Sequence, residues 1–432
     1  MGKSKIKVNS ILCFFLATSM LVYALRGKYG ALLISVSIFI TLFLQMKGKK
    51  KVNVVSTFYA LFLIVYAVFL HSMRSLFFKY YLMIGYLAAT ILLLNSDIKT
   101  YRSLWKFLRI IALFEAVGVY LQRSIPDLYY SIMTIILPFS VVEAIKNRLL
   151  SGYYTGFTRE VSYTMFLIAI GIGAYIFDDE IQKKRSKCMP IGRIITVLFL
   201  VGALFISGKR ATILFFGAAM FCVYFIHSDS KMKILRYLMI GFVLLFAIII
   251  TYPIWCKLSA MKRIIELIVF IEQKDLSGIT NGRIAIYKNA LQLWNTNRIF
   301  GIGWGNFKYS TDQSVWYAGF DVHNCYLQVL CENGFIGAIP FYILTIISLV
   351  DSIKCIIKTR NCDNHFHKWA LLCGYVQIFF ILYCMTEPIL YEYTDYIIYF
   401  ISINITEIIL KEQRKLCVCN ITHNSCYKKD KI

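Results

Sequence analysis

The chain is built from long apolar blocks, and this feature limits its possible folds more than any other. About twelve blocks approach the ~20 residues that an α-helix needs to cross the hydrocarbon core of a bilayer. Backbone groups in lipid must hydrogen-bond to one another, so each block is predicted to be an α-helix. We therefore predict an all-α, polytopic integral membrane protein with about 12 transmembrane helices. The expected spans are residues 8–25, 29–46, 54–70, 76–94, 104–121, 161–177, 191–206, 211–226, 234–252, 335–350, 369–385 and 389–410.

These spans divide the chain into four parts. Residues 1–252 hold transmembrane helices 1–9, and residues 335–410 hold helices 10–12. Between spans 9 and 10, residues 253–334 form one large extracytoplasmic loop, and residues 411–432 form a basic cytoplasmic tail. A loop of that length without structure of its own is unusual unless it is functional. It is expected to be partly helical, because apolar residues recur at helical intervals after a turn signal: Ile284, Tyr287, Leu291 and Trp294 follow Asn281-Gly282.

Charge gives the orientation. The 432 residues carry 47 Lys and Arg against 23 Asp and Glu, a net charge of +24. Most basic residues lie in short clusters between apolar blocks, and the clusters alternate in density from one connection to the next. Cytoplasmic connections carry the excess of Lys and Arg, so both termini are predicted in the cytoplasm and the long loop outside. No basic segment belongs to a soluble domain able to hold DNA or RNA, which argues against a nucleic-acid partner.

The long loop holds two motifs that could carry chemistry. Three glycines lie within five positions, at Gly301, Gly303 and Gly305, and Asn306 follows them. Such spacing lets backbone N–H groups approach an anion or a sugar, although a tight turn explains the glycines equally simply. His323-Asn324 comes next, where a histidine can accept a proton from a sugar hydroxyl at neutral pH or cap a helix.

Cations gather near the same side of the membrane. Lys209 and Arg210 occupy a very short connection between two spans, Arg283 opens the predicted loop helix, and Arg159 precedes another span. Taken singly, such residues are usually headgroup anchors. Taken together and near His323, guanidinium and ammonium groups on one face suit a diphosphate.

Acidic residues and cysteines leave alternatives open. Glu387, Glu392 and Asp395 lie at the outer end of the last span, where they could partner the nearby arginines or hold a metal ion. We expect ion pairing there, and we expect no metal and no cofactor. Cys256 and Cys325 both fall on the external side, and their spacing does not indicate whether they pair.

Several of these motifs together resemble the O-antigen ligase and O-antigen polymerase superfamily. The resemblance covers four segments: Gly156 to Glu160, Ser207-Gly208-Lys209-Arg210-Ala211-Thr212, Arg283 with Gly301 to Phe307, and His323-Asn324-Cys325-Tyr326-Leu327 with Glu332-Asn333-Gly334-Phe335-Ile336-Gly337. Members of this superfamily are metal-independent glycosyltransferases with a GT-C-like fold in the membrane. They use a glycan carried on a polyprenyl diphosphate at the outer face of the bacterial cytoplasmic membrane.

The resemblance implies a set of roles for residues of this chain. His323 is the expected base, and Arg210 and Arg283 are expected to stabilise the departing diphosphate. The expected substrate-binding residues are Lys209, Arg159, Asn324, Gly303, Asn306 and Glu332. No nucleophile for a covalent intermediate stands out, so we expect inversion at the anomeric carbon.

The resemblance leaves two reactions open. A polymerase joins lipid-linked repeat units to one another, whereas a ligase moves the finished glycan to lipid A-core or another acceptor. The Gly-Ile-Gly-Trp-Gly-Asn-Phe run and the His-Asn-x-Tyr-Leu-Gln spacing are more typical of a polymerase of O-antigen or capsular polysaccharide. Its partners are then the polyprenyl-diphosphate-linked glycan, membrane lipids and a chain-length regulator.

Two functions of other classes compete with an enzyme. A flippase for lipid-linked oligosaccharide predicts charged residues inside several spans and two similar halves, and a scaffold leaves the grouping of Arg and His unexplained. The polar residues of this chain gather at one external surface, which favours an enzyme.

Overall fold

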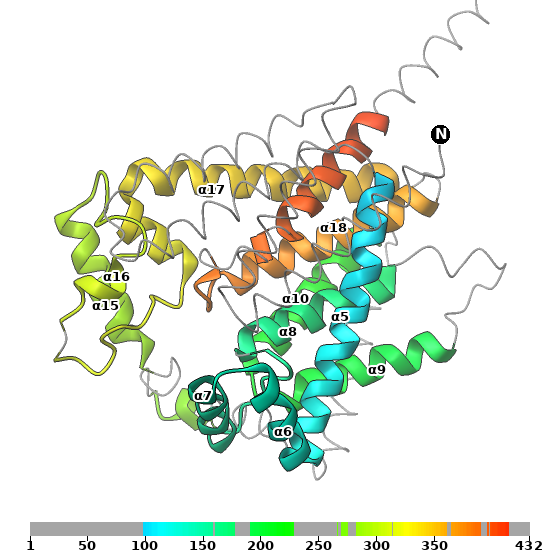
Figure 1. The fold of residues 1–432 in the computed structure, drawn as a ribbon. Helices are drawn as coiled ribbons and strands as arrows, with labels where there is room; N and C mark the ends of the chain where they lie inside the picture. The colour runs from blue at the N-terminus through cyan, green and yellow to red at the C-terminus, as the bar shows by residue number, and fades with distance from the viewer. Residues whose placement is uncertain are drawn as a thin grey trace, which may run out of the picture.

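The computed structural model describes residues 98–158, 160–177, 191–228, 266, 269–274, 282–312, 314–360, 364–389, 395–396 and 398–413 (Figure 1). Helices are the only regular secondary structure in these residues. The four spans predicted before residue 98, the ninth span at 234–252 and the tail after residue 413 lie outside the part described.

Six helices of the described part precede the long predicted loop. They are α5 (Ile98–Ser124), α6 (Pro126–Ile136), α7 (Phe139–Leu150), α8 (Val161–Phe177), α9 (Ile191–Ile206) and α10 (Arg210–His227). The later helices are α15 (Arg283–Thr296), α16 (Phe307–Ser310), α17 (Cys325–Thr359), α18 (Asn364–Tyr383) and a final helix over residues 398–413.

Several of these helices have the character of membrane spans. Within the described residues, Arg210–His227, Cys325–Thr359 and Phe366–Tyr383 are long and apolar enough to cross a bilayer. Val161–Phe177 and Ile191–Ile206 are apolar but shorter. Large apolar side chains also face outward, such as Leu198 on α9 at 63% exposure and Ile346 on α17 at 59%. The chain is thus an all-helical membrane protein in the part described, and the count of twelve spans stays a prediction.

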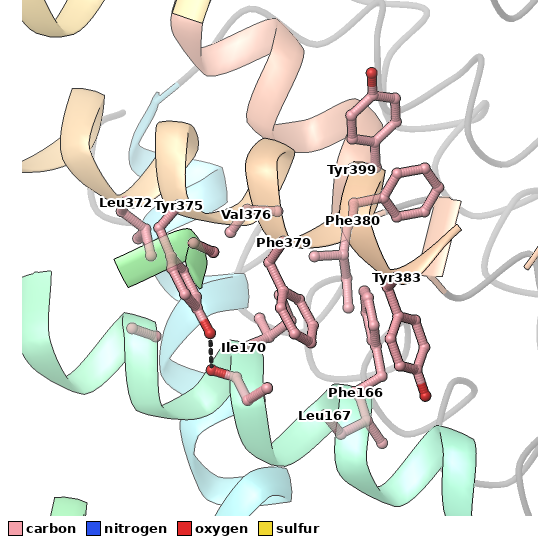
Figure 2. Packing of buried hydrophobic residues seen from close by; sticks show 14 of the residues in the cluster. Phe166, Leu167, Ile170, Leu372, Tyr375, Val376, Phe379, Phe380, Tyr383 and Tyr399 are labelled. Atoms are coloured by element: carbon pink, nitrogen blue, oxygen red, sulfur yellow. Dashed lines mark hydrogen bonds between the residues drawn. The ribbon is translucent and has the colours of Figure 1, made fainter. Parts of the chain in front are cut away.

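Helix α8 lies at the centre of the core. It is apolar on every side and buried almost throughout, as expected of a helix enclosed by others. It approaches α5 so closely that a Cβ atom on Gly171 would lie 2.2 Å from the Cβ atom of Ala112. On its other side, Phe166 packs against Phe379 and Tyr383 of α18, and the Tyr375 hydroxyl donates to the Ala169 carbonyl at 2.8 Å (Figure 2).

Antiparallel packing brings the same ends of several helices together. At one end, the Tyr383 hydroxyl donates to the Ser162 carbonyl at 2.8 Å, and the Cys325 N–H donates to the Cys384 carbonyl at 2.8 Å. We call this the site end. At the opposite end, His367 bonds to Thr359 and to His227. The predicted catalytic residues all belong to segments of the site end.

Helix α17 is bent at Gly334, which has non-helical torsion angles (φ 59°, ψ −164°). The bend lets the N-terminal piece of α17 turn against the loop after α15, and Figure 1 shows α15 and α16 beside this end of α17. The Phe335 N–H donates to the Arg298 carbonyl at 2.8 Å, and the Ile336 N–H donates to the Ile299 carbonyl at 3.2 Å. The residues after the bend, from Phe335 onward, coincide with the predicted start of span 10.

The bend gives a first testable prediction. Gly334→Ala will strongly destabilise the protein, because the positive φ costs an L-residue about 1–3 kcal/mol. In addition, the new Cβ atom would lie 2.3 Å from the Ile299 carbonyl oxygen. Gly217→Ala is the matched control, since a Cβ atom on this helical glycine of α10 meets nothing within 4 Å. Thermal unfolding in detergent compares the two, and an unchanged melting temperature for Gly334→Ala would contradict the described bend.

Candidate active site

The connection between α9 and α10 presents two cations at the site end. Gly208 has φ +81°, and a Cβ atom there would lie 2.4 Å from the Gly152 carbonyl oxygen, so the turn fits tightly against a neighbouring loop. Helix α10 begins at Arg210, so Lys209 and Arg210 stand at a helix N-terminus, where the helix dipole favours negative charge. Arg210 is half-buried and directly follows Lys209.

Lys209 belongs to a compact polar group. Its Nζ atom lies 2.7 Å from Glu387 Oε1 and donates a hydrogen bond to Ser162 Oγ. The Ser162 hydroxyl in turn donates to Glu387 Oε2 at 2.8 Å. The Lys209 ammonium also lies 5.7 Å from the centre of the Tyr383 ring. Three helical segments that are distant in sequence therefore hold this one cation.

Arg283 joins the group from the loop. It is the first residue of α15, directly after Gly282, which has a left-handed conformation (φ 75°). Its Nη1 atom donates to the Thr386 carbonyl at 2.9 Å. Thr386 is adjacent to Glu387, so α15 is docked with its N-terminal guanidinium beside the Lys209–Glu387 pair.

His323 completes the group from the N-terminal side of α17. Its φ of +54° is rare for a residue other than glycine, and strain of this kind tends to occur at functional sites. Asn324 follows as the N-cap of α17, where its Oδ1 atom accepts the Leu327 N–H at 3.0 Å. Among the described residues, the buried Nδ1 atom of His323 has no hydrogen-bond partner.

The charges of these residues influence one another. Burial lowers the pKa of His323 to about 4, with Arg283 and Lys209 adding to the effect and Glu387 opposing it. Burial alone would raise the pKa of Glu387, but Lys209 and Arg283 outweigh it and hold that pKa below its ordinary value. Burial lowers the pKa of Lys209, and Glu387 opposes the change. These pKa shifts favour the charged form of the Glu387 carboxylate and the neutral form of the His323 imidazole.

The glycine-rich loop is bound to the chain's own α17. The Gly303 N–H donates to the Glu332 backbone carbonyl at 2.8 Å. The Glu332 carboxylate accepts the N–H groups of Gly305 at 2.9 Å and Phe307 at 3.1 Å. A Cβ atom on Gly301 would lie 2.3 Å from the Glu332 carbonyl carbon, so the glycine allows a close backbone approach. The loop is a set of tight turns braced by a buried carboxylate.

The other predicted site residues have varied positions. Asn306 donates through Nδ2 to the Ile302 carbonyl at 3.0 Å and so also stabilises the loop. Arg159 lies outside the described residues. Next to it, Glu160 forms an ion pair with Arg148 at 2.5 Å. Contact of a sugar with Gly303, Asn306, Glu332 or Asn324 stays a prediction.

A buried carboxylate supports the segment that carries Arg159. Glu115 of α5 accepts the Phe157 N–H at 3.0 Å and the Thr164 hydroxyl at 3.3 Å through Oε2. Gln122 of the same helix accepts the Thr155 N–H at 2.8 Å. Helix α5 thereby fixes the loop that leads into α8.

Sequence reasoning did not include Glu387 and Ser162 among the site residues. The acidic residues near the end of the chain did suggest ion pairs with arginines, but Glu387 forms its ion pair with a lysine. Ser162 gave no signal, because an isolated serine at the start of a span is common. Within the described part of the chain, no three His, Cys, Asp or Glu side chains lie together as a metal site requires.

The comparison with known families agrees with this geometry. Residues 195–342 match the family model described as O-antigen ligase. The match covers about a third of the chain, and this segment is similar to the O-antigen ligase family. It includes the α9–α10 turn with Lys209 and Arg210, as well as Arg283 and His323. The match confirms the resemblance to the O-antigen ligase and polymerase superfamily, and a search of curated proteins found no match to the chain.

Proposed function

We propose that the chain is a membrane glycosyltransferase that polymerises polyprenyl-diphosphate-linked repeat units into O-antigen or capsular polysaccharide. The proposal rests on one observation above all: Lys209 pairs with Glu387, Arg283 bonds to the adjacent Thr386, and the charges of these residues act on His323. In this proposal the site end faces the outside of the bacterial cytoplasmic membrane, and both termini are cytoplasmic.

The cations would bind the diphosphate of the donor. Bidentate arginine–phosphate contacts hold a phosphate in a fixed direction, and Arg210 and Arg283 are the residues suited to them. Lys209 adds a compact charge at the N-terminus of α10. The outward apolar side chains of α17, such as Ile336 and Ile339, would give the polyprenyl chain a hydrocarbon-like surface.

The reaction then needs one proton acceptor and stabilisation of the leaving group. A hydroxyl of the acceptor sugar attacks the anomeric carbon, and the bond from that carbon to the diphosphate oxygen breaks. The electrons of the broken bond stay on the diphosphate, where preorganised cations stabilise them. The hydroxyl proton goes to His323, which is neutral at pH 7 because its pKa is about 4. Negative charge from the diphosphate would raise the proton affinity of this ring.

Direct attack predicts inversion at the anomeric carbon and requires neither a metal nor another cofactor. A chain-length regulator and membrane lipids would be the other partners. A flippase of lipid-linked oligosaccharide is the competing function from another class of protein. The polar group around the Lys209–Glu387 ion pair, at one end of the helices, favours the enzyme.

The similarity of residues 195–342 to the O-antigen ligase family favours a second candidate, an O-antigen ligase that transfers the finished glycan to lipid A-core. One glycan gel separates the two. A strain that lacks this chain will show a single repeat unit on the acceptor if the protein is a polymerase. Loss of all attached glycan, with lipid-linked polymer accumulating, would instead indicate a ligase. Normal chain lengths would exclude both activities, and accumulation of the repeat unit on the cytoplasmic side would indicate a flippase.

A further inference from the structure

Two cysteines meet beside the candidate active site. Cys325 is the first residue of α17, and Cys384 directly follows the last residue of α18. Both side chains are buried, at 0% and 1% exposure. The Cys325 N–H donates to the Cys384 carbonyl at 2.8 Å, and both cysteines carry free thiols in this structure.

The backbone hydrogen bond places the pair within the range of a disulfide. With standard bond lengths, an N···O distance of 2.8 Å limits the separation of the two Cα atoms to about 6.7 Å at most. Disulfide-bonded cysteines have Cα atoms ~4.4–6.8 Å apart. Two cysteines at this separation need little backbone movement to form the bond.

We propose that Cys325 and Cys384 are joined by a disulfide in the mature protein. The proposal shares with the proposed function only the outward orientation of the site end, because disulfides persist in oxidising compartments. The two thiols lose two protons and two electrons as the sulfur–sulfur bond forms. A thiol–disulfide oxidoreductase of the outer compartment accepts both and is reduced to its dithiol form. Since both sulfurs are buried in the fold, the exchange occurs before α17 and α18 have closed together.

The bond would connect the two segments that carry the site. Cys325 follows His323 and Asn324, and Cys384 precedes Thr386, whose carbonyl accepts from Arg283, and Glu387. A covalent link between these two segments would limit changes in the distance between the His323 imidazole and the Lys209–Glu387 pair. Notably, Cys256, the other candidate partner of Cys325, lies outside the described residues.

Mass spectrometry of the full-length protein tests the proposal. Membranes are solubilised with N-ethylmaleimide and without reductant, and the digested protein is searched for a peptide pair linked through Cys325 and Cys384. We expect the linked pair in the wild type and its loss after reduction or in the Cys384→Ser variant. The Cys331→Ala variant, which removes another buried thiol of α17, will keep it. Full alkylation of Cys325 and Cys384 without reduction would overturn the proposal.

A second measurement separates this failure from a failure of the proposed function. Ser314 is exposed in the loop before α17. Cells that express a Ser314→Cys variant, with a permeable outer layer and an intact cytoplasmic membrane, are treated with a membrane-impermeant maleimide. Labelling together with free Cys325 and Cys384 thiols rejects the disulfide alone. Absence of labelling would reject the outward orientation, on which the disulfide and the proposed glycan transfer both depend.

Discussion

The His323→Ala variant will accumulate in the membrane as full-length protein and lose long glycan chains. Removal of a positioned general base commonly lowers the rate ~10²–10⁴-fold. The variant breaks no hydrogen bond of the His323 Nδ1 atom, because this buried atom has no partner among the described residues. The measurement is a glycan gel, normalised to the amount of protein in the membrane.

His367→Asn is the matched control for this variant. His367 is also buried. It lies at the opposite end of α18, where it forms hydrogen bonds with Thr359 and His227. The His367→Asn variant will weaken a contact between helices and leave the length of the glycan chains unchanged. Wild-type chain lengths in His323→Ala would remove the histidine from the mechanism.

The pH dependence of transfer will follow the protonation of His323. The pKa of about 4 belongs to the free protein, so kcat/KM should stay level from neutral pH downward and fall only as pH approaches that value. A bound diphosphate brings negative charge beside the ring and raises its pKa. The acid limb of kcat should therefore lie at higher pH than the acid limb of kcat/KM. Assays at saturating and limiting donor check this order, and the reverse order would contradict it.

Hydropathy predicted some helices with accurate bounds. The predicted spans 161–177 and 191–206 coincide with α8 and α9, and 211–226 differs from α10 by one residue at each end. Apart from Arg193 in α9, these blocks are almost wholly apolar and end at polar or basic residues, so burial and lipid exposure select the same limits. The helix predicted after Asn281-Gly282 is α15, because the turn signal and the helical spacing agree.

The beginning of α17 could not be predicted in the same way. The sequence predicts a span from residue 335, whereas the helix begins at Cys325. The extra residues include Gln328, Glu332 and Asn333, which are polar and yet buried. They are buried because Glu332 binds the backbone of the glycine-rich loop, and composition alone does not reveal a partner of that kind.

Only some of the residues of the candidate active site could be predicted from the sequence. Lys209, Arg283 and His323 belong to motifs with unusual composition, so each attracted attention. Ser162 enters the site through the packing of α8 against α10 and α18, and its neighbours in sequence carry no signal of it. Glu387 belongs to an acidic group for which the sequence did predict ion pairing, but its partner Lys209 is brought to it by tertiary packing. A residue that pairs with a cation from a distant helix is recognised in the folded structure more readily than from motif spacing in the sequence.

Breaking the Lys209–Glu387 pair will lower both the stability of the protein and its activity, and the two losses can be measured separately. Lys209→Met leaves the Glu387 carboxylate, 7% exposed, without its ammonium partner. Removal of one member of a buried ion pair typically costs about 3–5 kcal/mol, because the remaining charge is uncompensated. We expect a lower melting temperature in detergent and strongly reduced glycan chains. Glu387→Gln will destabilise the protein for the same reason.

The double variant Lys209→Met with Glu387→Gln decides between the two effects. Replacing both charges removes the uncompensated carboxylate, so stability should recover most of the loss. Activity should stay low, because a cation that stabilises the departing diphosphate is still missing. Lys354→Met is the control for charge removal as such, since the Lys354–Asp351 pair is exposed and worth ~0–1 kcal/mol. If the double variant recovered both stability and long glycan chains, Lys209 would be a structural residue, and the diphosphate would have to be bound by Arg210 and Arg283 alone.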